Sequence, residues 1–118
     1  MRFVCLIYHD HAALDSRSEV EEQALTAECL AYDNNLRASG QLVLAHALNP
    51  PESAKKVRYQ RKVQITDGPF AESKEQLIGL VVIDARDDAE ALEIAGRSPL
   101  ARTGTIEVRG AFDIAWNA

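Results

Sequence analysis

Hydrophobic positions change their spacing along this chain, and each spacing predicts a different element. Residues 2–8 place apolar side chains on both sides of an extended segment, which is typical of a strand covered on two faces. Apolar residues then recur at helical spacing between Ser18, which forms a capping-box pattern with Glu21, and Gly40, a helix stop signal. These signals predict a helix over 19–39.

The middle of the chain alternates with the period of two that is expected of strands. A strand ended by residues 49–51 carries four side chains on one predicted face: Leu42, Leu44, His46 and Leu48. Residues 57–65 alternate between apolar and charged or polar types. This alternation predicts a half-exposed antiparallel hairpin that turns near Gln60 and Arg61.

The last third of the chain predicts a strand, a helix and a further strand. A short helical turn is expected over 72–77, followed by the most apolar strand of the chain over 78–84. Asp87 and Glu90 form a second capping-box pattern and start a helix that runs to Gly96. That helix is expected to face inward with Ala91, Leu92 and Ala95; a last core strand covers 105–109, and apolar alternation resumes at Phe112, Ile114 and Trp116.

The element order is β-α-β-β-α-β with an extra hairpin, which predicts a single ferredoxin-like α+β domain over residues 1–118. Right-handed crossovers place both long helices on one face of its sheet. Because the strands at 2–8 and 78–84 are apolar on both sides, the second face would leave an exposed apolar patch that monomers rarely carry. We therefore expect a homodimer in which a second subunit covers that face.

Composition and charge narrow the classes of function. The 118 residues are 47% hydrophobic and 26% charged, as in an ordinary globular domain, and no apolar run is long enough to span a bilayer. A net charge of -5 argues against general nucleic-acid binding, so the basic cluster over 55–62 is interpreted as a solvated hairpin, with nucleic-acid contact as the alternative. Residues 1–8 are interpreted as a strand rather than a signal peptide. Cys5 and Cys29 fall on apolar stripes as free thiols, which favours the cytoplasm.

Two residues are candidates for acid–base chemistry. Asp67 follows a strand at a tight turn, where it is either a turn former or a carboxylate held beside a cleft. His46 shares a predicted face with leucines, where it is either a core residue or, if the next strand returns beside it, a partner for Asp67.

Other polar residues have weaker claims. His9 and His11 surround Asp10 and predict either a polar loop or two ligands of a metal site. Glu72 is an exposed turn residue or faces a ligand, and Arg102 binds an anionic substrate or pairs with a surface acid. No Gly-rich phosphate loop, nucleophile elbow or zinc ribbon is present, so no cofactor is predicted.

The segment from Thr66 to Glu75 is longer than a turn requires. Its Asp-Gly-Pro start is strong turn chemistry, but the Phe-Ala-Glu-Ser-Lys-Glu that follows is not needed for a turn. Together with residues 77–80, 98–102 and 106–109, this run resembles the YCII-related proteins known as the DGPF family, over nearly the whole chain. The resemblance implies a dimeric α+β barrel, in which two sheets pack face to face, but no agreed activity.

The resemblance also limits which chemistry can be transferred. Some YCII relatives resemble lyases or dehalogenases that use a histidine on the first helix and an aspartate in an Asp-Pro pair after the last helix. Here the predicted first helix has no histidine, and Ser98-Pro99 stands at the Asp-Pro position, so that dyad is not transferred. The resemblance leaves Asp67 as the carboxylate that could take the place of that aspartate. The resemblance also implies a sigma factor of the extracytoplasmic-function type as a regulatory partner.

These observations predict a homodimer that binds or transforms a small molecule in a cleft between sheet and helices. The residues expected to line or adjoin that cleft are Tyr8, His46, Asp67, Glu72 and Arg102. The alternatives are a non-enzymatic accessory protein that binds a sigma factor, and a domain whose activity is dimerisation alone.

Overall fold

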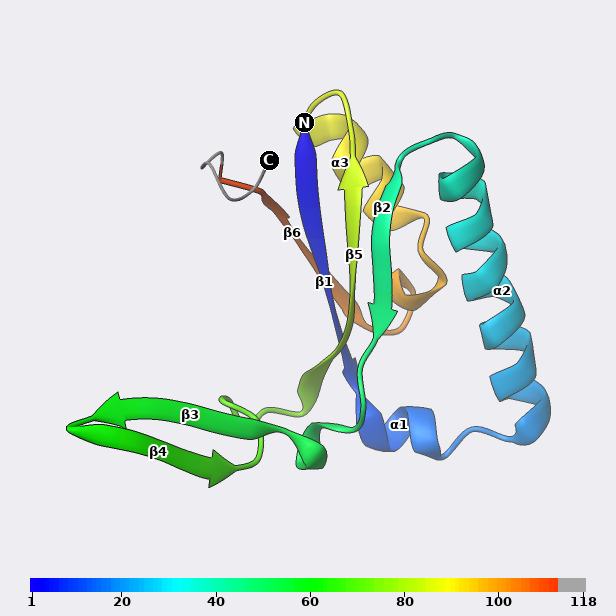
Figure 1. The fold of residues 1–118 in the computed structure, drawn as a ribbon. Helices are drawn as coiled ribbons and strands as arrows, with labels where there is room; N and C mark the ends of the chain where they lie inside the picture. Colours follow the sequence, from blue (N-terminus) through cyan, green and yellow to red (C-terminus); the bar gives the residue numbers. More distant parts are fainter. Residues whose placement is uncertain (113–118) are drawn as a thin grey trace.

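A computed structural model of the chain describes residues 1–112. It contains six strands, three α-helices and two 3₁₀ turns (Figure 1): β1 (Arg2–Asp10), α1 (His11–Asp15), α2 (Glu19–Ala38), β2 (Leu42–Ala47), η1 (Pro51–Ser53), β3 (Lys55–Gln60), β4 (Lys62–Asp67), β5 (Glu75–Asp84), α3 (Asp88–Gly96), η2 (Pro99–Ala101) and β6 (Thr105–Gly110). The α+β class with antiparallel sheets is confirmed.

Two separate sheets organise these elements. A four-stranded antiparallel sheet has the order β2-β5-β1-β6, so the two most apolar strands, β1 and β5, are its interior strands. The second sheet is the β3–β4 hairpin, whose strands pair with each other and which projects from the body (Figure 1). The hairpin turns at Arg61, which adopts φ +64°, as the alternation predicted.

Local signals define the helix ends. Ser18 accepts a hydrogen bond from the Glu21 amide at 3.1 Å and its own amide donates to the Glu21 carboxylate at 3.3 Å, which confirms the capping box of α2. Asp87 caps α3 by accepting from the Glu90 amide at 2.9 Å, while the Glu90 carboxylate accepts from the amide of Arg86 instead of closing the box.

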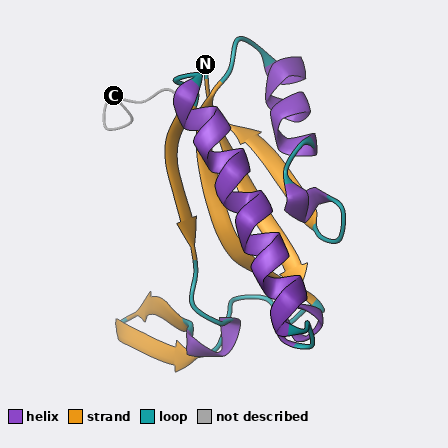
Figure 2. Ribbon diagram, turned by 90° about the vertical axis from the view of Figure 1, so that its right-hand side faces the viewer, coloured by secondary structure: helices purple, strands orange, loops and turns teal. Residues whose placement is uncertain are grey.

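One face of the four-stranded sheet forms the core with α2 and α3 (Figure 2). Alternate residues of β1 and β5 point toward the helices, and Ile83 and Ile94 are fully buried there. Burying a side chain of this size stabilises the fold by about 1.5–3 kcal/mol. The buried cluster consists of Phe3, Cys5, Ile7, Leu36, Val81, Ile83, Ala85, Ala91, Ile94 and Ala95.

The opposite face of the sheet is apolar as well, but partly exposed. Val4 pairs with Val82 and Leu6 pairs with Leu80, all four on the side away from α2 and α3. We call this surface, with Leu44 of β2, the open face. Within residues 1–112 no helix covers this face. The structure therefore agrees with the prediction that the helices cover one apolar face of the sheet and leave the other exposed.

The prediction that residues 42, 44, 46 and 48 share one strand face is wrong. A bulge between Leu42 and Leu44 shifts the alternation by one residue. Leu42 pairs with Ile83 and packs against the core, whereas Leu44 pairs with Val82 and is 42% exposed on the open face. Leu48 lies beyond the end of β2.

Two further expectations need correction. The segment 72–77 forms no helical turn, because β5 already begins at Glu75, which pairs with Asp10. Leu92 is 60% exposed, since the buried stripe of α3 follows the spacing of Ala91, Ile94 and Ala95. Ile114 and Trp116 lie outside the described residues, and no helix within residues 1–112 combines the length and hydrophobicity needed to cross a membrane.

We predict that Tyr32 makes the stability of the fold depend on pH in the alkaline range. Its hydroxyl donates to the Ile94 carbonyl at 2.7 Å and joins α2 to α3. Burial raises the pKa of Tyr32 from 10.0 to about 12, so this contribution is complete below pH 10 and is lost between pH 10 and 12. Tyr32→Phe should lower the free energy of unfolding by about 1 kcal/mol at pH 8.

Urea denaturation of the two proteins from pH 8 to pH 12 measures the effect. The difference between them should narrow above pH 10, because other groups titrate in both proteins alike. A difference that stays constant up to pH 12 would contradict the assigned role of the hydroxyl.

Candidate functional site

A cleft of about 710 Å³ lies where the end of β1, the start of α2 and residues 99–103 meet. We call it the His9 cleft. Its volume is within the range of small-molecule sites. Its wall combines small apolar side chains with charges of both signs, and its polar lining includes His9, Asp10, Arg17, Glu28, Lys74, Arg102 and Thr103.

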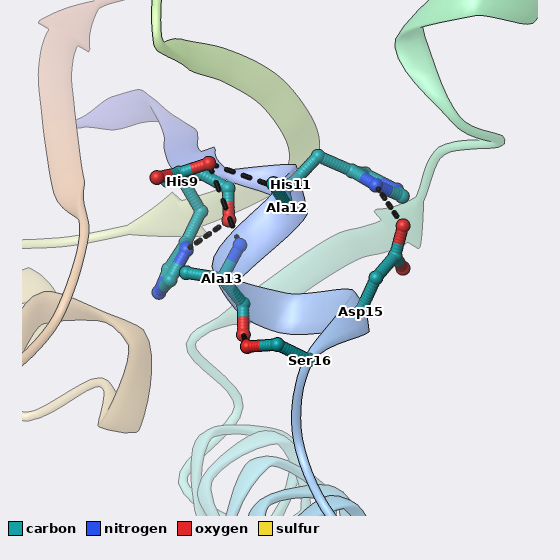
Figure 3. A network of polar contacts seen from close by, with 7 residues as sticks. His9, His11, Ala12, Ala13, Asp15 and Ser16 are labelled. Atoms are coloured by element: carbon teal, nitrogen blue, oxygen red, sulfur yellow. Dashed lines mark hydrogen bonds and ion pairs between the residues drawn. The ribbon is translucent and has the colours of Figure 1, made fainter.

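His9 is the buried polar residue of this cleft. The alternation of β1 turns it to the same side as the core residues Phe3, Cys5 and Ile7, and it is 2% exposed. Its Nε2 lies 2.7 Å from Oγ1 of Thr103, and its Nδ1 lies 3.2 Å from the carbonyl of Asp10 (Figure 3 shows the latter contact). Because a carbonyl only accepts, Nδ1 is the donor of its contact, and in the singly protonated ring Nε2 accepts from the Thr103 hydroxyl.

Asp10 fixes the position of the chain beside His9 through contacts of both its carboxylate oxygens. Its Oδ1 accepts from the amides of Ala12 at 3.1 Å and Ala13 at 3.4 Å, which caps α1. Its Oδ2 lies 3.9 Å from the ammonium group of Lys74, on the segment before β5. The carboxylate therefore both starts the short helix and contributes negative charge to the cleft.

The charged groups around the His9 cleft form ion pairs that are exposed to water. Arg102 pairs with Glu28 of α2, and the two side chains are 62% and 49% exposed. Ion pairs with this much exposure contribute about 0–1 kcal/mol. A bound molecule that offers its own charge or hydrogen-bonding groups can therefore replace these pairs at small cost.

Gly104 allows the two walls to come together. A Cβ atom at this position would lie 2.4 Å from the carbonyl oxygen of Tyr8 and 2.8 Å from the His9 ring. Any side chain here would push the 99–103 segment away from β1. The hydrogen bond between His9 and Thr103 thus depends on the absence of a side chain at 104.

This arrangement can bind a polar molecule and move a proton. Nε2 of His9 can take the proton of the Thr103 hydroxyl, and Thr103 is exposed at the cleft wall. Arg102 and Lys74 offer donors to an anionic group, while Asp10 and Glu28 accept from donors.

Among the other hollows of the described residues, two adjoin residues that the sequence singled out. A cavity of about 230 Å³ lies under α2 beside Cys29, Asp33 and Ser98; burial raises the pKa of the Cys29 thiol and of the Asp33 carboxyl. The Ser98 hydroxyl there accepts from the Leu100 amide at 3.3 Å and caps η2. A second hollow, of about 480 Å³, lies between Tyr8 and the segment that follows the Asp-Gly-Pro turn.

The structure does not bring the predicted site residues into one cleft. Arg102 lines the His9 cleft, but Tyr8 points to the other side of β1, because neighbouring strand residues face opposite ways. His46 lies opposite Leu80 on the open face and is exposed, and it also adjoins the cavity of about 230 Å³ beside Cys29. The expectation of one shared cleft between sheet and helices is therefore wrong within one chain.

The remaining predicted residues lie at the base of the hairpin. Asp67 ends β4, accepts from Lys55 at 2.5 Å and has a side chain that is 83% exposed. The turn after it has the predicted positive φ at Gly68, +91°. Glu72 is exposed in the following segment. Catalytic or ligand-binding roles for Asp67, His46 and Glu72 stay predictions.

His9 and His11 do not face each other. His9 points inward to Thr103, whereas Nδ1 of His11, at the start of α1, lies 3.1 Å from the Asp15 carboxylate (Figure 3). Residues 1–112 contain no group of three or more His, Cys, Asp or Glu side chains placed to hold a metal ion. If the alternation of Phe3, Cys5 and Ile7 had been continued by two residues, it would have predicted that His9 points inward. Nothing local indicated Thr103.

Comparisons with known proteins cover nearly the entire chain. The profile of the YCII-related domain matches residues 1–115. An uncharacterized protein of Rhizobium meliloti (strain 1021) is 32% identical over 112 residues, which cover 92% of this chain and 90% of that protein.

We predict that Gly104→Ala disrupts the His9 cleft. The new methyl group would meet backbone atoms of Tyr8, so we expect the free energy of unfolding to fall by about 1–3 kcal/mol. Gly96→Ala is the matched control, because a Cβ at Gly96 meets nothing within 4 Å and this residue ends α3. It should leave stability unchanged or raise it by up to about 1 kcal/mol. Thermal unfolding of both variants tests the difference, and equal melting temperatures would contradict it.

Proposed function

Since the chain belongs to the YCII-related domain family, we propose that it is a homodimer that binds a small polar molecule in the His9 cleft. The observation that carries this proposal is the hydrogen bond between the buried imidazole of His9 and the exposed hydroxyl of Thr103. A histidine that only filled the core would not need to contact a cleft. Here the ring supports a group on the cleft wall.

The lining favours one class of ligand. Arg102 pairs with Glu28 and Lys74 lies 3.9 Å from Asp10, and both cations have exposed side chains. Such a site suits a small molecule with an anionic group, held by the guanidinium of Arg102, and with hydroxyl or amino groups that donate to Asp10 or Glu28. Ala24 and Leu25 of α2 add a small apolar surface for its carbon skeleton.

The homodimer is supported by the open face. A ferredoxin-like unit with an apolar sheet surface free on one side can bury that surface against the same surface of a second copy, as in a dimeric α+β barrel. Val4, Leu6, Leu80 and Val82 would form the centre of such an interface. Tyr8 lies on the same side of β1 as Val4 and Leu6, so the hollow that it lines would lie near the partner subunit, and a ligand-facing role for Tyr8 is part of the proposal.

Asp67, His46 and Glu72 would act only through such an assembly, because none of the three lines the His9 cleft in its own chain. The alternative function is that of a non-enzymatic accessory protein that binds a sigma factor. It predicts that a transcription factor is retained from cell extract, with no stabilisation by small molecules.

We expect small polar anions to stabilise the protein in a thermal-shift screen of amino acids, hydroxy acids and sugar phosphates. A molecule present at about 100 times its dissociation constant adds about 2.7 kcal/mol, which is a shift of several degrees. Arg102→Gln should abolish the shift, because it removes the guanidinium proposed to donate hydrogen bonds to the anionic group of the ligand. Thr103→Val should reduce the shift. Asp67→Asn should leave the shift unchanged.

The matched control is Arg86→Gln. Arg86 is also an exposed arginine in an ion pair, with Glu90 at 2.7 Å, but it follows the end of β5 that lies opposite the start of β1, far from His9. A shift that survives in Arg102→Gln, or disappears in Arg86→Gln, would exclude the His9 cleft as the site. Loss of the shift in Asp67→Asn would instead indicate that the ligand binds at the base of the hairpin.

A further inference from the structure

The β3–β4 hairpin, residues 55–67, is an arm that stands away from the body of the protein (Figures 1 and 2). Its two strands pair with each other, from Lys55 opposite Asp67 to Gln60 opposite Lys62, and form a sheet of their own. An isolated two-stranded hairpin is at best marginally stable in water. An arm of this kind therefore needs a surface to pack against.

The arm has one apolar and one polar face. Val57 pairs with Ile65 and Tyr59 pairs with Val63, so these four side chains share a face. Their exposures are 66%, 64%, 74% and 59% in the order named, although they are among the residue types most strongly favoured in buried strands. The other face presents Lys56, Arg58, Gln60, Lys62, Gln64 and Thr66.

The arm and the rest of the chain carry opposite charge. Residues 55–67 contain five basic residues and one acidic residue, a net charge of +4, so the remaining residues carry -9 of the total of -5. An apolar face on a basic arm matches a partner that is acidic and offers an apolar surface. A second copy of this chain has both properties, because its body is acidic and it exposes large apolar side chains outside the open face, among them Val20, Leu30 and Leu48.

We infer that the arm docks on the body of a second copy of this chain, with Val57, Tyr59, Val63 and Ile65 as its contact face. This inference rests on the proposed homodimer and names the element that extends its interface beyond the open face. In a two-fold symmetric dimer each subunit both gives and receives an arm, so every contact is made twice. Opposite charges on arm and body steer the two copies together.

The dimer dissociation constant, measured by sedimentation of the full chain, tests the inference. Val63→Ser with Ile65→Ser removes half of the contact face, counted twice in a symmetric dimer, and should raise the dissociation constant by about 30-fold or more. Gln64→Ser with Thr66→Ser is the matched control, because these residues lie on the polar face of the same strand. This control should leave the dissociation constant unchanged.

Charge gives a second, independent measurement. Arg58→Glu with Lys62→Glu leaves the contact face intact, and it should weaken the dimer most in low salt. Wild type should lose affinity as salt rises, whereas the charge-reversed protein should depend less on salt. Circular dichroism of each variant is the control for whether the body remains folded.

The outcomes separate this inference from the function proposed above. If the wild type is a dimer and Val63→Ser with Ile65→Ser does not weaken it, the arm does not dock, and the homodimer stands. If that dimer is unaffected but a DNA duplex of random sequence binds the wild type and not the charge-reversed protein, the arm serves nucleic acid instead. If the wild type is a monomer at all concentrations, both arm docking and the homodimer are overturned, while the His9 cleft is still tested by its own ligand screen.

Discussion

The pairing of β1 with β5 is the constraint on which the rest of this structure depends. These interior strands carry apolar side chains on both faces, and their register puts Cys5 beside Val81 on one side and Leu6 beside Leu80 on the other. The two packing helices cover the first of these sides. Because the period of a strand is two, a register shift by one residue would exchange the two faces, so that Val4 and Leu6 would face the helices and His9 would face away from Thr103. Every site described above takes its orientation from that register.

The His9 cleft is a consequence of the same alternation at the end of the strand. The last inward position of β1 is occupied by a histidine instead of another aliphatic residue, and its ring reaches Thr103, which follows η2. Gly104 lets the two segments approach closely enough for this contact. The cleft thus combines one buried polar group, the His9 ring, with charged groups, Arg102 and Lys74, that are exposed. Such a division suits a site that selects a ligand by charge and orients it against one hydroxyl.

The arm and the open face are both apolar surfaces that a single chain leaves exposed to water. Both present aligned apolar side chains that a monomer leaves in water, and both belong to strands whose register is well defined. Burial of apolar area provides about 25 cal/mol per Å², so the two surfaces together offer more stabilisation than either alone. The basic charge of the arm adds direction to that attraction, since the body it would meet is acidic.

The pattern of residues was enough to predict the class of fold, the order of the main elements and most of their ends. Capping residues and strict alternation are local, so Ser18, Asp87 and the hairpin turn at Arg61 could be located without knowledge of the fold. It also showed that the sheet has two apolar faces. What it could not show were the places where one residue changes the phase of a pattern. The bulge after Leu42 moved Leu44 to the open face, and β5 replaced a predicted helical turn.

The candidate site was determined by tertiary structure. Asp67, His46, Tyr8 and Arg102 were grouped by topology alone, and the faces of the strands and the projection of the arm separated them. Thr103 carries no local signal, because its role comes from a contact with a residue 94 positions earlier in the chain. The direction of a side chain depends on the register of its strand, and the register is set only when the strands pair. The local pattern could therefore predict the elements, whereas the residues that contact one another depend on the tertiary structure.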